Sequence, residues 1–338
     1  MARRSWTAAW APAVAAGLLL GAPASGQAPP STTQERLGHP AGARLIVIHA
    51  DDLGMAHSVN RATFEALERG WITSASLLVP CPWFPEAARW ARAHPDADLG
   101  VHLALNSEWT GFRWGPVSGA SAVPSLLDAD GYLPLVEPTV VQQAKPAEVE
   151  RELRAQIDRA RAAGVRLTHL DSHMGTLFGS QALFDVYRRL GAAYDLPLLI
   201  ERIGERGEAS GFAPGAQADA LVDRVVSIEP GVSPAGWPAA YEKMLAPLPP
   251  GVYELIVHLA HDDDEMRGAT SDHPDWGAAW RQSDFDLVRS AWFQGFLRSH
   301  GFVPVKWSEL VSISKGALRR APLNPRSLRG SESRSAPH

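Results

Sequence analysis

The chain has 338 residues, of which 45% are hydrophobic and 20% are charged, so it can bury a large core in one barrel-type domain or in two smaller domains. Its net charge of -5 and its pI near 6.2 give no sign of the basic patch that nucleic-acid-binding proteins usually carry. These values favour a neutral or weakly polar partner and argue against a nucleic acid.

The first residues have the composition of an export signal. An Arg-Arg pair precedes an apolar, alanine-rich run that ends at Leu20, and small residues follow it. This pattern predicts a signal peptide over residues 1–28, because the apolar run is short for a membrane span. An uncleaved anchor is the alternative. We therefore expect an exported protein, periplasmic or extracellular, with no stable membrane insertion after the signal is cleaved.

The remaining chain is predicted to form one folded domain at 44–314. Residues 29–43 are rich in Pro, Ser, Thr, Gln and Gly and are expected to be a linker, while the polar residues 315–338 are expected to be a disordered tail. Cys81 is the only cysteine of the chain, which excludes an intrachain disulfide.

Strand and helix patterns alternate through this domain. Strands are expected at 44–50, 72–79, 98–105, 166–170, 196–200, 252–259 and 302–305. Helices are expected at 57–70, 83–94, 146–164, 181–194, 216–226, 237–245, 285–300 and 307–313. The stretch 106–145 is rich in Gly, Pro, Ser and Trp and is expected to be a binding loop or lid. About seven β/α units predict a single distorted TIM-like (β/α) barrel of the α/β class, with its site at the carboxyl ends of the strands.

The first expected strand ends in two adjacent carboxylic acids, Asp51 and Asp52. The apolar, β-branched run at 45–48 before them is typical of a buried strand, and Gly54 follows them. Adjacent like charges resist joint ionisation, and a divalent cation would remove that conflict. The alternative is that the pair caps the next helix.

Histidines and a further aspartate lie at the ends of other expected strands. They are His102 in the third strand, Asp171 and His173 after the fourth, and His258 and His261 after the late strand. Carboxylate and imidazole ligands from separate strands suit a divalent metal, which activates water for a neighbouring carboxylate base. Alternatively, His102 is a hydrogen-bonded core histidine, and Asp171 orients a ligand imidazole without binding metal.

Other polar and aromatic residues are expected to have structural roles or have two alternative roles. His169 lies inside a strand and is expected to be structural, and the acidic run at 262–265 is expected to be a solvated loop. Arg281 and Asp284 either pair with each other or orient Asp51. Tryptophans near the expected loops could stack on sugar rings, or else pack in the core: Trp109, Trp114, Trp237, Trp276 and Trp280.

Five short strings of this sequence resemble the motifs of the YdjC/ChbG-type (ChbG/HpnK) carbohydrate deacetylases, a group that includes the hopanoid-linked deacetylases. The strings are His-Ala-Asp-Asp-Leu-Gly at 49–54, Asn60, Gly-Val-His-Leu at 100–103, Thr-His-Leu-Asp-Ser-His at 168–173 and Tyr-Glu-Leu-Ile-Val-His at 253–258. They occur in family order between about residues 44 and 310.

The resemblance implies a barrel of the polysaccharide-deacetylase type that holds one divalent metal ion. By this resemblance, Asp52, His102 and His173 bind the ion, Asp51 is the general base and His258 is the catalytic acid. An Asp-His-His set suits Zn²⁺, with Mg²⁺ the next expectation and Mn²⁺ or Ni²⁺ as alternatives. The implied activity is hydrolytic removal of N-acetyl groups from an amino-sugar oligosaccharide or glycan, which makes a carbohydrate the expected partner.

Two departures from the family pattern leave the particular sugar open. Met174 and Gly175 follow His173, where relatives often have further histidines, and Leu259 follows His258, where relatives often have proline. An O-acetyl carbohydrate esterase with the same metal site is one alternative, and a glycan-binding module with a relic metal site is another. The presence of Asp51 argues against the binding module, because binding alone needs no base. A homodimer is allowed but not predicted.

Overall fold

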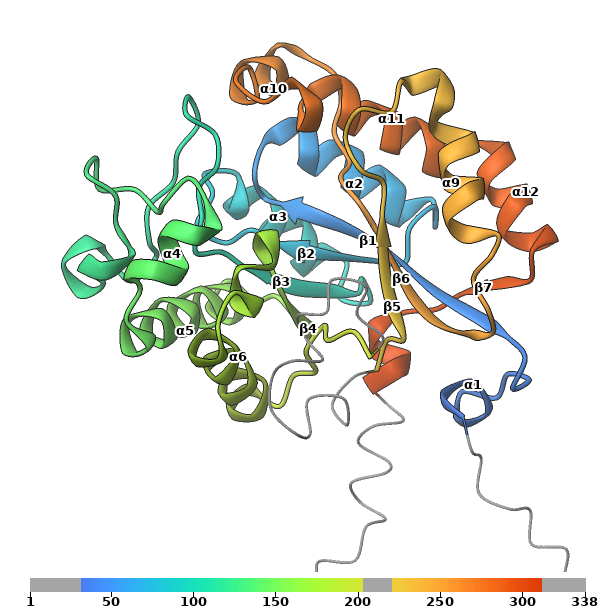
Figure 1. The fold of residues 1–338 in the computed structure, drawn as a ribbon, viewed down its shortest axis with the longest axis horizontal. Coiled ribbons are helices and arrows are strands. Elements are labelled where there is room, and N and C mark those ends of the chain that lie inside the picture. Colours follow the sequence, from blue (N-terminus) through green and yellow to red (C-terminus); the bar gives the residue numbers. More distant parts are fainter. Residues whose placement is uncertain (1–31, 203–220, 312–338) are drawn as a thin grey trace, which may run out of the picture.

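The computed structural model describes residues 32–202 and 221–311 (Figure 1). The expected signal peptide at 1–28 and tail at 315–338 lie outside these residues. The described part of the expected linker at 29–43 contains the helix α1 (Thr33–Arg36), which a reciprocal capping box between Thr32 and Glu35 starts. This segment is therefore not wholly irregular. Within the described ranges, every helix is too short or too polar to span a bilayer.

Strands and helices alternate along the chain, as the sequence predicts. The strands are β1 (Arg44–Leu53), β2 (Ser74–Leu77), β3 (Leu99–Leu103), β4 (Leu167–Ser172), β5 (Arg224–Ser227), β6 (Gly251–Val257) and β7 (Phe302–Pro304). The α-helices that follow α1 are α2 (His57–Glu68), α3 (Phe84–Ala93), α4 (Glu137–Gln143), α5 (Pro146–Ala162), α6 (Gln181–Tyr194), α9 (Trp237–Leu245), α10 (Asp264–Ala269), α11 (Ala278–Val288) and α12 (Ala291–Ser299). Short 3-10 helices are η1 (Ala120–Ala122), η2 (Pro124–Leu126), η3 (His173–Phe178), η4 (Pro234–Gly236) and η5 (Pro274–Trp276).

The strands form one parallel sheet in the order β4-β3-β2-β1-β6-β5. β7 pairs with the first residues of β1, while β2 pairs with the last ones, so the two short strands share one side of β1. Two isolated parallel bridges, Leu170 to Leu198 and Glu201 to Val222, connect β4 with the start of β5 and close the ring. The structure thus confirms the predicted distorted (β/α) barrel.

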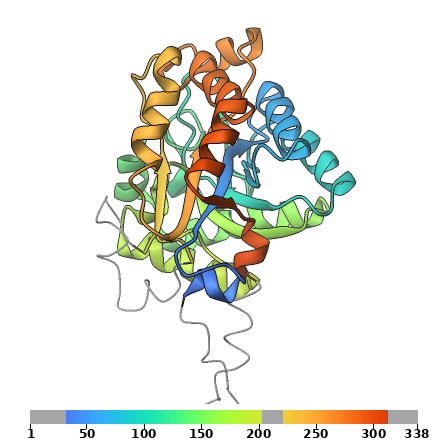
Figure 2. The same cartoon turned by 90° about the vertical axis from the view of Figure 1, so that its right-hand side faces the viewer.

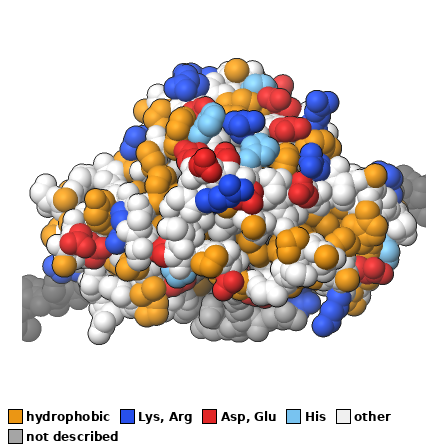
Figure 3. Space-filling model, turned by 90° about the horizontal axis from the view of Figure 1, so that it is seen from above, with side chains coloured by type: hydrophobic (Ala, Val, Ile, Leu, Met, Phe, Trp, Pro, Cys, Tyr) orange, Lys and Arg blue, Asp and Glu red, His pale blue; other side chains and the backbone are white. Residues whose placement is uncertain are grey.

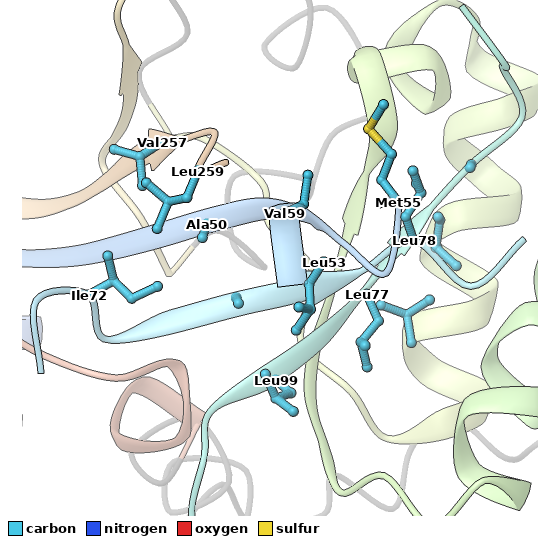
Figure 4. Close-up of a cluster of buried hydrophobic side chains, with 14 of the residues drawn as sticks. Ala50, Leu53, Met55, Val59, Ile72, Leu77, Leu78, Leu99, Val257 and Leu259 are labelled. Carbon is cyan, nitrogen blue, oxygen red and sulfur yellow. The ribbon is translucent and has the colours of Figure 1, made fainter. Parts of the chain in front are cut away.

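The helices lie outside the ring of strands, and the strands occupy the middle of the molecule (Figures 1 and 2). A continuous apolar core fills the space between these layers. Around the carboxyl half of β1 it includes Ala50, Leu53, Val59, Ile72 and Leu77, all 2% exposed or less (Figure 4). This packing fixes the end of β1, where the two aspartates lie, against α2 and β2.

Several predicted elements differ in the structure. The single helix predicted at 285–300 is two helices, because the Ser290 hydroxyl accepts the Phe293 N–H and starts α12. The prediction of a helix at 216–226 is wrong in its described part, where β5 begins at Arg224, since Val225 and Val226 suit a strand. The stretch 106–145 contains short helices within its loop.

Candidate active site

A bulge at the end of β1 brings Asp51 and Asp52 to the same cavity. Between its pairs with β2 at Ala50 and Leu53, β1 uses one residue more than its neighbour. Asp52 has a φ of 67°, a left-handed conformation that costs free energy for a residue other than glycine. Successive side chains of a regular strand point to opposite faces, so the bulge is what allows both acids to line one cavity.

The turn after the two aspartates is held by Asn60. The Gly54 N–H donates to Asn60 Oδ1 at 2.7 Å, and the Asn60 amide donates to Glu86 Oε2 at 2.8 Å. Gly54 has a φ of 101°, which disfavours other residues, and an added Cβ would lie 3.2 Å from the Phe84 backbone. Asn60, one of the residues that carry the family resemblance, therefore supports the geometry of Asp52 from outside the cavity.

The acidic run at 262–265 is only partly the solvated loop that the sequence predicts. Glu265 accepts hydrogen bonds from the backbone N–H groups of His57 and Ser58, which begin α2, and Asp263 caps α10. Asp264 is solvent-exposed. The face of the molecule that carries α10 shows acidic and basic side chains interspersed (Figure 3). The acids of this run therefore tie the β6–α10 connection to the helix that follows Asp52.

Asp52, His102 and His173 form a compact buried group. Asp52 Oδ1 lies 3.6 Å from His102 Nε2 and 3.5 Å from His173 Nδ1, and the potential ligand atoms all lie within 4.8 Å of one another. One carboxylate and two imidazoles are a common donor set for a divalent metal. The structure therefore places the three residues that the resemblance assigns to the metal where a single ion could contact them all.

A carboxylate holds the second nitrogen of each of these histidines. Asp171 Oδ1 lies 3.0 Å from His102 Nδ1, and Glu108 Oε2 lies 2.9 Å from His173 Nε2. Histidines that bind metals almost always have such a partner, which fixes the ring and its tautomer. Asp171 therefore orients the His102 ring, which is the alternative role that the sequence left open for it. Glu108 follows β3 in a loop, and no sequence pattern pointed to it.

Two other groups are equally compact, and both contain Asp171. They are His49 with His169 and Asp171, and Asp51 with His102 and Asp171. Both carboxylate oxygens of Asp171 already have imidazole partners, at 3.0 Å on His102 and 3.1 Å on His49. Asp52 Oδ1 has no hydrogen-bond partner, although it is buried. We therefore assign the candidate metal position to the group that contains Asp52.

Arg281 pairs with the other oxygen of Asp52. Its Nη2 lies 2.8 Å from Asp52 Oδ2, and the two side chains are 3% and 2% exposed. Burial by itself would raise the pKa of Asp52, but the Arg281 charge helps to hold that pKa well below its usual value. Asp52 is therefore ionised at neutral pH, as a metal ligand must be.

When no metal is bound, both histidines of the group hold a proton more strongly than a free imidazole does. Burial would lower the pKa of His173, but Glu108 and Asp52 outweigh it and raise the pKa to about 10. Burial also opposes the charge on His102, yet Asp51 and Asp171 raise its pKa above the usual value. A metal ion must displace these protons before it can bind.

Asp51 and His258 lie next to the group, at the mouth of the barrel. Asp51 Oδ2 is 3.6 Å from His102 Nε2 and 3.8 Å from His258 Nε2. Burial lowers the pKa of His258 to about 4, so its imidazole is neutral at neutral pH. The His258 backbone N–H donates to Asp284 Oδ2 at 2.9 Å. Arg281 thus holds the Asp52 carboxylate, and Asp284 holds the His258 backbone. These contacts differ from both roles that the sequence suggested, which were a pair between Arg281 and Asp284 or the orientation of Asp51.

A cavity of about 520 Å³ opens beside these residues. Its lining includes the aromatic side chains of Trp109 and Trp276 and the apolar side chains of Val136 and Met174. Met174, the residue after His173, has a φ of 53° and is 38% exposed. The departure from the family pattern after His173 therefore places an apolar side chain on the cavity wall.

Three other candidates from the sequence do not line the cavity. His169 is buried inside the barrel, stacked on Trp307 with 4.9 Å between ring centroids. His261 packs against Phe285. The Trp237 indole donates to Asp284 at 3.0 Å, so this tryptophan supports the site without lining the cavity.

The fold and this site define a parallel (β/α) barrel with a carboxylate–imidazole group at the carboxyl ends of its strands. The family model described as YdjC-like protein matches residues 45–299. The chain belongs to this family.

Relatives support this assignment over nearly the whole domain. The chain is 36% identical to a carbohydrate deacetylase of Thermus thermophilus over 291 residues, which cover 85% of this chain and 98% of the relative. It is 37% identical to a carbohydrate deacetylase of Brevibacillus brevis over 153 residues, which cover 45% of this chain and 58% of that protein. The fold is similar to that of an Enterococcus faecalis protein described as a cellobiose-phosphate cleavage protein, with a TM-score of 0.66 and 24% identity over 79% of this chain and 99% of that one.

Proposed function

We propose that this protein is an exported, metal-dependent carbohydrate deacetylase that removes N-acetyl groups from an amino-sugar oligosaccharide or glycan. The observation that carries the proposal is the buried Asp52–His102–His173 group, which lies beside a second carboxylate, Asp51, at the wall of a cavity of about 520 Å³. The names of the relatives, carbohydrate deacetylase, supply the reaction class.

The residues present fit a divalent ion. Asp52 is ionised and offers the buried, unpartnered Oδ1, and His102 and His173 have their second nitrogens held by carboxylates. When bound there, a divalent ion supplies Lewis-acid polarisation of a carbonyl and lowers the pKa of a bound water. We propose Zn²⁺ as the ion, with Mg²⁺ as the alternative, because two imidazoles favour the softer metal.

Asp51 is placed to act as the general base. Its Oδ2 lies on the cavity side, 3.6 Å from His102 Nε2, and it takes the proton of the water that attacks the acetamide carbon. His258 is neutral at rest, so it does not begin as an acid. We propose that it receives that proton across the 3.8 Å from Asp51 and delivers it to the departing amine. The water is thereby divided between acetate and a free amino sugar.

The cavity suits an uncharged sugar. Its aromatic and apolar wall, with Trp276, Val136 and Met174, can pack against the faces of pyranose rings. Arg281, the one arginine or lysine among the described lining residues, is already paired with the ionised Asp52. The lining also includes the carboxylate of Glu137. A phosphorylated or otherwise anionic sugar would therefore find no unpaired arginine or lysine among the described lining residues to bind its charge.

Acetate release from N-acetylated chito-oligosaccharides, measured with and without a chelator, tests the proposal. We expect release by the metal-loaded protein, loss of release after chelation, and recovery when Zn²⁺ or Mg²⁺ is added back. Turnover that survives complete metal removal would refute metal dependence. Faster release from O-acetylated sugars would identify the esterase instead, and tight glycan binding without release would identify a binding module.

Two variants separate the proposed roles. Asp51→Asn should abolish turnover and leave the metal bound, because it removes the base but no proposed ligand. His102→Ala should lose the metal, which metal analysis of the purified protein detects. If the Asp51→Asn protein stays folded but loses the metal, the two aspartates have exchanged the proposed roles.

A further inference from the structure

We propose that His49 is a positioning residue that holds the base Asp51 and, through Asp171, the proposed ligand His102. This inference rests on the function proposed above. His49 is fully buried in β1, two residues before Asp51, so the alternation of the strand directs both side chains to the barrel interior. Its side chain is fully buried and does not line the cavity.

One nitrogen of His49 contacts both carboxylates. Nε2 lies 3.3 Å from Asp51 Oδ1 and 3.1 Å from Asp171 Oδ2, and the Ser76 hydroxyl lies 3.1 Å away. Because an ionised carboxylate oxygen only accepts hydrogen bonds, Nε2 carries the proton of its hydrogen bond to Asp171, and Asp51 Oδ1 lies at ion-pair distance from the same nitrogen. The same N–H group therefore donates to Asp171, which orients a proposed ligand, and faces Asp51, the proposed base.

These contacts leave the second oxygen of each carboxylate, Asp51 Oδ2 and Asp171 Oδ1, to face the other residues of the site. With Oδ1 attracted to His49 at 3.3 Å, Asp51 directs Oδ2 toward His102 and His258, at 3.6 and 3.8 Å. With Oδ2 held by His49, Asp171 directs Oδ1 to His102 Nδ1 at 3.0 Å. Loss of the N–H group would free the rotation of both carboxylates, and displacement of a catalytic group by about 1 Å can cost about 100-fold in rate.

The other side of the ring is enclosed. Glu254, which is also fully buried, lies on the neighbouring strand β6 with its Oε1 3.7 Å from His49 Nδ1. The His169 ring packs edge-on against His49, with 5.0 Å between the centroids. His49 therefore has no access to the cavity, and its influence on the reaction must pass through Asp51 and Asp171.

His169 offers a matched control for a purely structural effect. It is as buried as His49 and touches the same ring, but its Nδ1 bonds the Thr168 hydroxyl at 2.9 Å and its face stacks on Trp307. It belongs to the barrel interior and is outside the proposed catalytic machinery. Loss of packing should affect both histidines, whereas loss of positioning should affect only His49.

The experiment compares His49→Leu, His49→Gln, His169→Leu and His169→Gln in the full-length protein. For each we would measure kcat and KM for acetate release, the Kd for Zn²⁺ by calorimetry, and the Tm. We expect His49→Leu to lower kcat about 100-fold with KM changed less than about threefold. We expect its Zn²⁺ affinity to fall about tenfold through the loosened Asp171. His49→Gln retains an N–H donor and should lose only about tenfold in kcat, so the conservative variant gives partial rescue.

The His169 variants should lower the Tm and keep kcat and Zn²⁺ affinity within about threefold of the wild type. The proposal is overturned if His49→Leu keeps kcat and metal affinity within that range, or if the His169 variants lose as much of both. If His49→Leu does not fold, His49→Gln and His169→Gln decide by the same criteria. If the wild type releases no acetate, the proposed function fails. The positioning role of His49 is then decided by the Zn²⁺ affinities of the same variants alone.

Discussion

Replacing Arg281 with Met tests how the site tolerates the buried charge of Asp52. The Arg281 Nη2 and Asp52 Oδ2 atoms are 2.8 Å apart, and both side chains are almost fully buried. At an effective dielectric constant of about 20, two charges at this separation attract by about 6 kcal/mol. The methionine variant leaves Asp52 buried without its partner, and removal of one member of such a pair costs about 3–5 kcal/mol. We expect the free energy of unfolding of the metal-free protein to fall by that amount.

Urea unfolding in excess chelator at pH 7 measures this loss. Arg267→Met is the matched control, because Arg267 makes a pair of similar length with Asp262, at 2.7 Å, but is 59% exposed. Screening by water limits that pair to about 0–1 kcal/mol. Equal losses in the two variants would refute the claim that burial makes the Asp52 pair strong.

Added Zn²⁺ provides a second test of the same variant. In the wild type, Arg281 already compensates the charge of Asp52, and it also repels a cation that approaches Oδ1. The metal should therefore stabilise Arg281→Met more than it stabilises the wild type, measured as the rise in unfolding free energy at equal metal concentration. A smaller rise in the variant would show that Arg281 acts mainly by orienting Asp52 for the metal.

Three further outcomes follow from the structure. Zn²⁺ affinity should rise from pH 6 to pH 8, with proton release in calorimetry, because the proton on His173, whose pKa is about 10, competes with the metal; affinity independent of pH would contradict this. Glu265→Ala should lower the unfolding free energy by about 1–2 kcal/mol, since two N–H groups at the start of α2 lose their acceptor; an unchanged urea midpoint would contradict it. Gly100→Ala should lower it by about 1–3 kcal/mol, because the new Cβ would lie 2.3 Å from His169 Nε2. Gly111→Ala, which enters open space, is the control, and equal urea midpoints for the two would contradict the clash.

The fold could be predicted because its signals are local. Three elements have signals within a short window of sequence. They are the apolar run before Asp51, the helix at 146–164 with its proline start, ordered charges and glycine stop, and the strand ending at His258. The ends of parallel strands then meet at one rim, which brings the separate acids and histidines together. The break near Ser290, which the prediction missed, had a local signal as well, since serine is a preferred N-cap.

The partners that hold the site could not be predicted in the same way. Arg281 lies on α11 and contacts Asp52, and Glu108 lies in the loop after β3 and contacts His173. An arginine or glutamate on a helix or loop is most often a solvated surface residue, so composition and periodicity carry no signal for these contacts. Only the closure of the barrel determines which of the many charged residues point inward.

The bulge in β1 changes the meaning of the two adjacent aspartates. Regular alternation would send Asp51 and Asp52 to opposite faces of the sheet, so one of them would face the helices and serve no site. The left-handed backbone at Asp52 costs about 1–3 kcal/mol, and this strain persists because surrounding contacts determine the conformation. Asn60 holds the turn that follows, and Arg281 holds the Asp52 carboxylate. A proposed base and a proposed metal ligand can therefore be neighbours in sequence because the surrounding fold stabilises one strained residue.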